Sequence, residues 1–168
     1  MSTIERRAGV VVFAVCAALS VPMVGAFGQS AAADSTLTLF EHDTQQTMVD
    51  LGDPGPGPGD EFLFAGDVFD HAGGTNVGHV AGKCTTLSGD AKNGDAFCQG
   101  TFVLEGGQLA VQGLADTAAL FGTGEPGDVA IVGGTGIYAN ARGDGTIQVP
   151  PDVPNQTDSN FVLNVVTG

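Results

Sequence analysis

The stretch Asp128–Gly145, DVAIVGGTGIYANARGDG, decides the fold of this chain. A short apolar run, 129–132, leads into closely spaced glycines and then into Ala141-Arg142-Gly143. A strand followed by Gly134-x-Gly136-x-x-Ala139 also begins a dinucleotide-binding fingerprint, which needs a helix directly after its glycines. The residues that follow here cannot sustain a helix beyond one turn. We therefore interpret the glycines as turn and close-approach positions between two β-strands.

The rest of the chain repeats this pattern of short strands. No window of a dozen residues shows a helical period with caps, and β-type runs are divided by Gly, Pro, Asp and Asn. The runs that we predict as strands are 35–41, 61–69, 76–87, 96–104, 108–114, 128–132, 143–149 and 160–166. Residues 52–60, GDPGPGPGD, predict a surface loop, and 115–127 is expected to cover one mouth of the fold or to form a helical turn.

Eight short antiparallel strands predict an all-β fold, an up-and-down barrel or a sandwich. A closed barrel of eight strands has room for side chains or for one small ligand. The alternation of apolar and polar residues leaves open whether the apolar face lines the lumen or the outside.

The N-terminal residues 1–33 have the pattern of a secretory signal peptide. Arg6 and Arg7 precede the uncharged apolar run 8–24, and small residues follow up to Ala33. We predict cleavage near Ala33 and a single barrel domain over 34–168, a secreted protein with no membrane contact after cleavage. A retained membrane anchor is the alternative, but Pro22 and Gly25 break the apolar run.

The predicted mature chain is strongly acidic. It has 3 basic residues against 18 acidic ones, a net charge of −15, because cleavage removes Arg6, Arg7 and Glu5 from the full-length charge of −14. Such a surface repels nucleic acid and anionic membranes. It is compatible with a secreted protein that binds small neutral or cationic ligands.

Two cysteines, Cys84 and Cys98, remain after the predicted cleavage. An exported chain meets an oxidising compartment, which favours a disulfide. If the runs 76–87 and 96–104 pair as a hairpin, the two cysteines fall near each other. A free reactive thiol is the alternative.

Several motifs together resemble one family. VGGTGIYANARGDG (132–145) resembles the VGGTG and ARG segments of dirigent proteins and the GGSGIF turn of allene oxide cyclases. VGHVAGKC (77–84) is similar to VGITAGLC of the cyclases and VGRAQG of the dirigents. LAVQG (109–113) matches the cyclases' SVQG, and His42-Asp43 resembles the HD that ends a dirigent strand. The matches keep their order over most of the mature chain, from Leu37 to about Gln148, and resemble the allene oxide cyclase/dirigent barrel superfamily.

The resemblance implies an eight-stranded antiparallel barrel with a hydrophobic cavity, which in the plant proteins often forms a trimer. A homo-oligomer, dimer or trimer, is an option for this chain. It implies a small apolar or phenolic ligand whose cyclisation or coupling the protein steers, as an isomerase- or cyclase-type activity without a cofactor or metal. Such catalysis depends on positioning in an apolar site with one or two polar groups. The alternative is a secreted barrel that binds a ligand or serves a structural role without chemistry.

The same resemblance assigns roles to residues. Asp43 matches the acid of the dirigent strand, and Arg142 matches the arginine of the ARG segment, so both are candidate catalytic residues. Arg142 could pair with Asp43, hold an anionic ligand group or tie down the turn by an ion pair. Phe40, Phe64 and Tyr138 are candidate ligand contacts.

The sequence also departs from the family. The strand-one Glu and Asn of the cyclases fall on Thr38 and Phe40, and the dirigent arginine of VGRAQG is replaced by His79. Cys84 matches a cavity cysteine of the cyclases, whose thiol a bond to Cys98 would remove. The first departure argues against allene oxide cyclisation itself.

His42, His71 and His79 with Asp43, Asp67 and Asp70 could be read as a metal site. Their spacing fits no standard site, and Asp67-x-x-Asp70-His71 lies on a predicted turn. We interpret these side chains as solvated turn residues and predict no metal.

Overall fold

The computed structural model describes residues 33–90, 93–120, 125–150 and 158–168. The predicted signal peptide 1–33 therefore lies, apart from Ala33, outside the described residues. No helix in the described ranges is long and apolar enough to cross a membrane.

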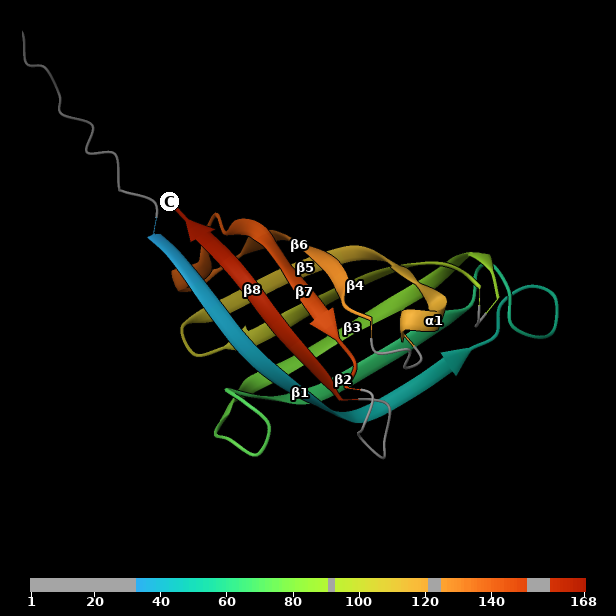
Figure 1. The fold of residues 1–168 in the computed structure, drawn as a ribbon, viewed down its shortest axis with the longest axis horizontal. Helices are drawn as coiled ribbons and strands as arrows, with labels where there is room; N and C mark the ends of the chain where they lie inside the picture. The colour runs from blue at the N-terminus through green and yellow to red at the C-terminus, as the bar shows by residue number, and fades with distance from the viewer. Residues whose placement is uncertain (1–32, 91–92, 121–124, 151–157) are drawn as a thin grey trace, which may run out of the picture.

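Eight β-strands run in chain order around a closed barrel, each antiparallel to the next (Figure 1). Strand β8 closes the barrel on β1 through nine residue pairs, from Ala33↔Thr167 to Glu41↔Ser159. The strands are β1 (Ala33–Val49), β2 (Glu61–Phe69), β3 (Asn76–Gly89), β4 (Gly94–Leu104), β5 (Gly107–Asp116), β6 (Gly127–Gly134), β7 (Arg142–Gln148) and β8 (Ser159–Thr167). The barrel prediction is confirmed, and the sandwich is excluded.

Strand β1 is longer than the run that the sequence predicts. Its first half pairs with β8 and its second half, Phe40–Val49, pairs with β2, so the polar residues after Asp43 continue the strand. The register shifts between Asp43 and Gln45, and the hydroxyl of Thr44 donates a hydrogen bond to the carbonyl of Ala65 at 3.1 Å. A bulge of this kind bends a strand and redirects its side chains.

The glycine-rich stretch forms the connection between β6 and β7. After β6 the chain makes a 3₁₀ turn, η1 (Gly136–Tyr138), and then enters β7. Gly136 adopts a φ of 62° and lies against the backbone of Gly106, where a side chain would clash. The glycines thus serve as turn and close-approach positions, as predicted, and no dinucleotide-type helix follows them.

The apolar face of the strands lines the lumen, which answers the question that the alternation left open. One half of the lumen is packed solid around Leu39, Val68, Leu109, Leu163 and Val165, all at most 5% exposed. Phe102 and Phe161 close this packed half, with their rings edge to face at 5.0 Å. This half lies toward η1 and the end of β8, whereas the helical turn α1 (Thr117–Leu120) lies at the opposite end (Figure 1).

Candidate functional site

The half of the barrel beyond Phe102 and Phe161 holds a cavity of about 270 Å³. This volume is at the small end of ligand pockets and suits a compact molecule. Its walls come from the ends of all eight strands that lie nearest to α1, and from Leu120 of α1 itself. Its apolar lining comprises Phe62, Phe64, Val80, Phe102, Val111, Ala115, Leu120, Val129, Ile147, Val149 and Phe161.

A second, smaller hollow lies beneath the loop that joins β1 and β2. The side chain of Asp60 holds this loop by accepting hydrogen bonds from the backbone N–H groups of Leu51 at 2.9 Å and Gly57 at 2.8 Å. The hollow shares Phe62, Cys84 and Leu120 with the main cavity. The proline-rich loop therefore covers the wall of the cavity, which the sequence alone did not indicate.

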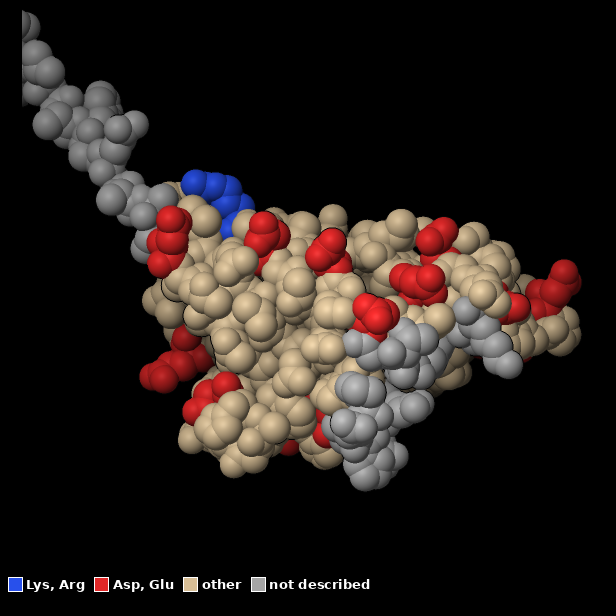
Figure 2. Space-filling view, in the orientation of Figure 1, with Lys and Arg blue, Asp and Glu red and all other residues tan. Residues whose placement is uncertain are grey.

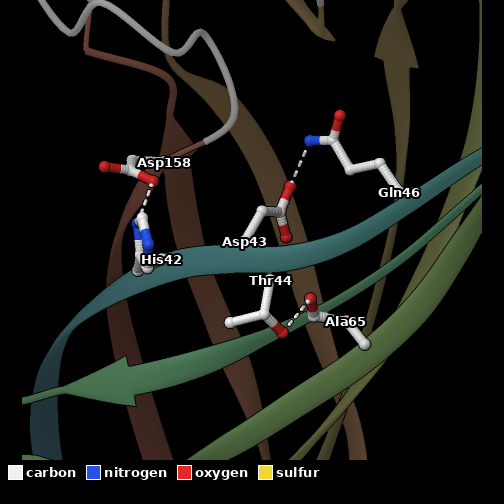
Figure 3. A network of polar contacts seen from close by, with 6 residues as sticks. All are labelled: His42, Asp43, Thr44, Gln46, Ala65 and Asp158. Carbon is white, nitrogen blue, oxygen red and sulfur yellow. Dashed lines mark hydrogen bonds and ion pairs between the residues drawn. The ribbon is translucent and has the colours of Figure 1, made fainter.

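Two carboxyl groups of β1 face the cavity. Glu41 and Asp43 are two residues apart on a strand, so their side chains project from the same face as Leu39. Glu41 is buried, at 3% exposed, where β1 pairs with both β2 and β8. Asp43 accepts a hydrogen bond from Nε2 of Gln46 at 2.6 Å, and both residues project from the same side of β1 in Figure 3.

Each of these carboxyl groups keeps one oxygen without a hydrogen-bond partner. These atoms, Oε1 of Glu41 and Oδ1 of Asp43, are buried and are the two unpartnered side-chain atoms among the described buried groups. Two ionised carboxylates can only accept hydrogen bonds, so they satisfy each other only if one is protonated. A proton on Glu41 can then be donated to Asp43.

The surroundings of the pair favour that shared proton. Burial raises the pKa of Glu41 to about 9, and the negative charges of Asp43 and Asp158 act in the same direction. Burial also raises the pKa of Asp43, against the opposing effects of its hydrogen bonds to Gln46 and Glu41. Near neutral pH Glu41 therefore keeps its proton, which it can share with Asp43.

His42 and Asp158 form a second polar contact beside the carboxyl pair. Asp158 precedes β8, and its Oδ1 lies 2.8 Å from Nδ1 of His42, as Figure 3 shows. His42 faces away from the cavity, because it alternates with Glu41 and Asp43 along β1. The contact ties the start of β8 to the strand that carries the two acids.

The predicted site residues divide between the two ends of the barrel. Asp43 and Phe64 line the cavity, and Phe64 stacks beside Phe62 with ring centroids 6.1 Å apart. Phe40 alternates with Glu41, and its ring lies 6.5 Å from that of Phe69 rather than in the cavity lining. Tyr138 packs against the buried core from η1.

Arg142 lies at the far end of the barrel from Asp43. Val166 of β8 pairs with Arg142 on one side and with Asp34 of β1 on the other, so Arg142 lies level with Asp34. Nine residues of extended strand, about 30 Å, separate Asp34 from Asp43. Arg142 is exposed, and the structure does not bring it together with Asp43.

Glu41 is the site residue that sequence reasoning missed. The signal was present, because the alternation of Leu37 and Leu39 places Glu41 and Asp43 on the same face of the strand. It could not be used while the orientation of that face was unknown. The glycine-rich stretch contributes Asp128 and Val129 to the cavity, from its β6 end.

The predicted disulfide is confirmed. Cys84 and Cys98 face each other in the β3–β4 ladder with Cα atoms 4.0 Å apart and are bonded. Both line the cavity, so the bond fastens its wall and leaves no free Cys84 thiol there.

Replacing both cysteines by Ser should lower the free energy of unfolding by about 3 kcal/mol, because the bond closes a loop of about fifteen residues in the unfolded chain. Urea unfolding with and without a reducing agent measures this. Wild type should lose the same amount on reduction, and the double variant should not respond to the reductant. An unchanged wild-type midpoint on complete reduction would contradict this expectation.

Fold and site together define a class of protein: a closed eight-stranded antiparallel barrel with one end packed and the other hollowed around a buried acid pair. The sequence profile described as "Allene oxide cyclase barrel like domain" matches residues 37–163. The chain belongs to this family. No curated protein sequence matches it.

Solved structures agree with this membership. A pyocyanin demethylase is 28% identical with a TM-score of 0.63, and the match covers 78% of this chain and 99% of that one. The Diels–Alderase AbmU from Streptomyces koyangensis is 22% identical with a TM-score of 0.61, over 81% of this chain and 63% of that one. A pterocarpan synthase dirigent protein is 15% identical with a TM-score of 0.61, over 82% and 86% of the two chains. The last two similarities establish the shared fold.

Proposed function

We propose that this barrel binds a small hydrophobic or phenolic molecule in its cavity and steers the cyclisation or coupling of that molecule. The observation that carries the proposal is the partly unpartnered carboxyl pair, the buried Glu41 and the half-buried Asp43, in a mostly apolar cavity. A buried acid costs stability, and strongly shifted acids in a cavity are characteristic of functional sites. The names of the structural relatives, a demethylase, a Diels–Alderase and a pterocarpan synthase, all describe chemistry on small organic molecules.

The mechanism that we propose uses positioning and electrostatic stabilisation. The phenylalanine walls hold the molecule in one folded conformation, which gives the reacting atoms their proximity and orientation. The carboxyl groups of Glu41 and Asp43 stabilise positive charge on the substrate as it develops. The catalytic role predicted for Arg142 would require that residue to act from the far end of the barrel, so the proposal rests on the acid pair.

The experiment is to identify the molecule that the protein retains and then to follow its fate. Small molecules released from natively purified protein are identified by mass spectrometry and returned to the empty barrel. We expect a new product with one stereoisomer in excess, and an Asp43→Asn variant should lose that excess. Asp67→Asn is the matched control, because Asp67 is an exposed residue on the neighbouring strand β2.

If the molecule is recovered unchanged after incubation with the barrel, this would contradict catalysis and favour the alternative, a carrier. A barrel that retains no molecule and binds no hydrophobic probe would contradict the whole proposal.

We also propose that the chain acts outside the cytoplasm. The disulfide supports this, since such bonds persist in oxidising compartments. The N-terminal sequence of the mature protein tests it, with Asp34 as the expected first residue. A mature protein that begins at Met1 would contradict export by signal cleavage.

A further inference from the structure

Apart from the proton that Glu41 and Asp43 can share, two oxygens of the acid pair have no hydrogen-bond partner in the described protein. Glu41 is 97% buried and lines the cavity, and its Oε1 has no hydrogen-bond partner. Asp43 is half-buried and also lines the cavity, and its Oδ1 is a buried atom without a partner. Buried polar atoms without partners are rare in native proteins and call for an explanation. A ligand that occupies the cavity is the explanation that the position of these oxygens favours.

The charges around the pair decide what kind of ligand this is. Asp128 at the start of β6 adds a third carboxylate to the lining, and none of the described lining residues is Lys, Arg or His. Of the basic residues in the described ranges, Lys83 is bonded to Glu61 and Arg142 is exposed at the far end of the barrel. A ligand that bears a carboxylate or phenolate would meet only like charge.

The aromatic lining favours the opposite charge. Phe62, Phe64, Phe102 and Phe161 all border the cavity, and the face of an aromatic ring attracts a cation, more strongly where water is excluded. A flat aromatic ligand can stack on these phenylalanine rings, and a positive charge on it can interact with the unpartnered oxygens of Glu41 and Asp43.

We propose that the ligand is a small, flat organic cation, with a quaternary or protonated nitrogen on an aromatic frame, and that it displaces the proton shared by Glu41 and Asp43. This names the ligand class of the site described under Proposed function and rests on that function. The exchange is balanced in charge: the cation enters, one proton leaves to solvent, and the pair becomes two carboxylates.

The exchange makes binding dependent on pH. The titratable groups near Glu41 are Asp43 and His42 on its own strand and Asp158 before β8, and Asp128 on β6 lines the same cavity. Burial keeps the pKa of Glu41 near 9, so the proton must still be removed at neutral pH. The affinity for a cation therefore rises with pH up to about 9, whereas the affinity for a neutral molecule does not.

Three probes of nearly one shape test the inference by isothermal titration calorimetry near pH 8: N-methylquinolinium, its neutral isostere 1-methylnaphthalene, and the anion 1-naphthoate. We expect the cation to bind at least tenfold more tightly than the neutral isostere, and the anion not to bind. Titrations in buffers of different ionisation enthalpy should show close to one proton released with the cation and none with 1-methylnaphthalene.

The double variant Glu41→Gln/Asp43→Asn should lose the preference for the cation and still bind 1-methylnaphthalene, which shows that its cavity is intact. The matched control is Glu105→Gln/Asp67→Asn, at exposed positions outside the cavity, which should behave as wild type. If the double variant does not fold, the single variant Glu41→Gln tests the inference, because it should abolish the proton release that accompanies binding of the cation.

Equal affinity for the cation and the neutral isostere, or a cation preference that survives the double substitution, would overturn the ligand class and leave the proposed function standing. Failure of both N-methylquinolinium and 1-methylnaphthalene to bind would overturn the two together.

Discussion

Replacing Glu41 by Gln should raise the free energy of unfolding more at pH 8 than at pH 5. The difference between the two gains should reach up to about 4 kcal/mol. Glu41 is buried in the folded barrel, and burial raises its pKa from 4.5 to about 9. In the unfolded chain the same carboxyl is solvated and ionises at its ordinary pKa. Gln has nearly the same shape and carries no proton to lose, so it removes this difference between the two states.

The sign follows from proton binding. Between pH 4.5 and about 9 the folded protein holds a proton on Glu41 that the unfolded chain has released. Stability therefore falls as pH rises through that window, by at most about 1.4 kcal/mol for each pH unit. The raised pKa of Asp43 acts in the same direction. Asp60 acts at lower pH, because hydrogen bonds from Leu51 and Gly57 lower its pKa, and its contribution is lost only under strong acid.

Urea unfolding at pH 5, 6, 7 and 8 measures the effect. The wild-type midpoint should fall steadily over this series, and the Glu41→Gln midpoint should fall much less. Glu105→Gln is the control, because Glu105 is exposed in the turn between β4 and β5 and the same chemical change is made there outside the barrel interior. Parallel wild-type and Glu41→Gln series would show that Glu41 is ionised in the folded barrel, and would contradict the assignment.

A residue that destabilises its own fold needs another reason to be there. A leucine at position 41 would extend the pattern of Leu37 and Leu39 and add apolar contact to the lumen. Stabilising changes of this kind are easily found in proteins, and they commonly reduce function where an active site depends on strain or buried charge. The expected stability gain of Glu41→Gln, together with a loss of activity, would locate the function at this residue.

The sequence predicted the fold well because strand pairing is local in this topology. Each strand pairs with the next one along the chain, so runs of alternating residues divided by turns such as Glu105-Gly106-Gly107 define the order. The disulfide followed from the same pairing, since a β3–β4 hairpin brings Cys84 opposite Cys98. The length of β1 was missed, because its second half is polar and pairs only with β2.

The site was harder to predict because it depends on which end of the barrel is open. The motif that contains Arg142 and the strand that contains Asp43 resemble the same family, yet they lie at opposite ends. Sequence order carries no information about which inward-facing positions pack together and which leave a gap. That depends on side-chain volume: Phe102, Leu109 and Leu163 fill one end, whereas Gly100 and Gly113 line the other.

Replacing Gly100 by Leu should fill this gap and lower the affinity for a cavity ligand about 100-fold or more. Gly100 is in β4 and lines the cavity at a position where a Cβ atom would have ordinary contacts, 3.6 Å from Cζ of Phe64 and 3.8 Å from Cγ2 of Val80. Its backbone is not in the left-handed region, so a side chain causes no strain there. The remaining carbons of Leu extend into the 270 Å³ volume and exclude a ligand of similar size.

The fold should tolerate this substitution, because Leu is a better strand residue than Gly and buries apolar surface. We expect an unchanged or slightly higher free energy of unfolding, by up to about 1 kcal/mol, from urea unfolding. Gly133→Leu is the matched control: Gly133 has no atom within 4 Å of an added Cβ and does not line the cavity, so binding should be unaffected. Calorimetric titration of both variants with 1-methylnaphthalene gives the comparison. If Gly100→Leu folds and binds the probe as tightly as wild type, the ligand does not lie in the cavity beside Gly100 and Phe64. The hollow beneath the loop after β1 then becomes the site to test.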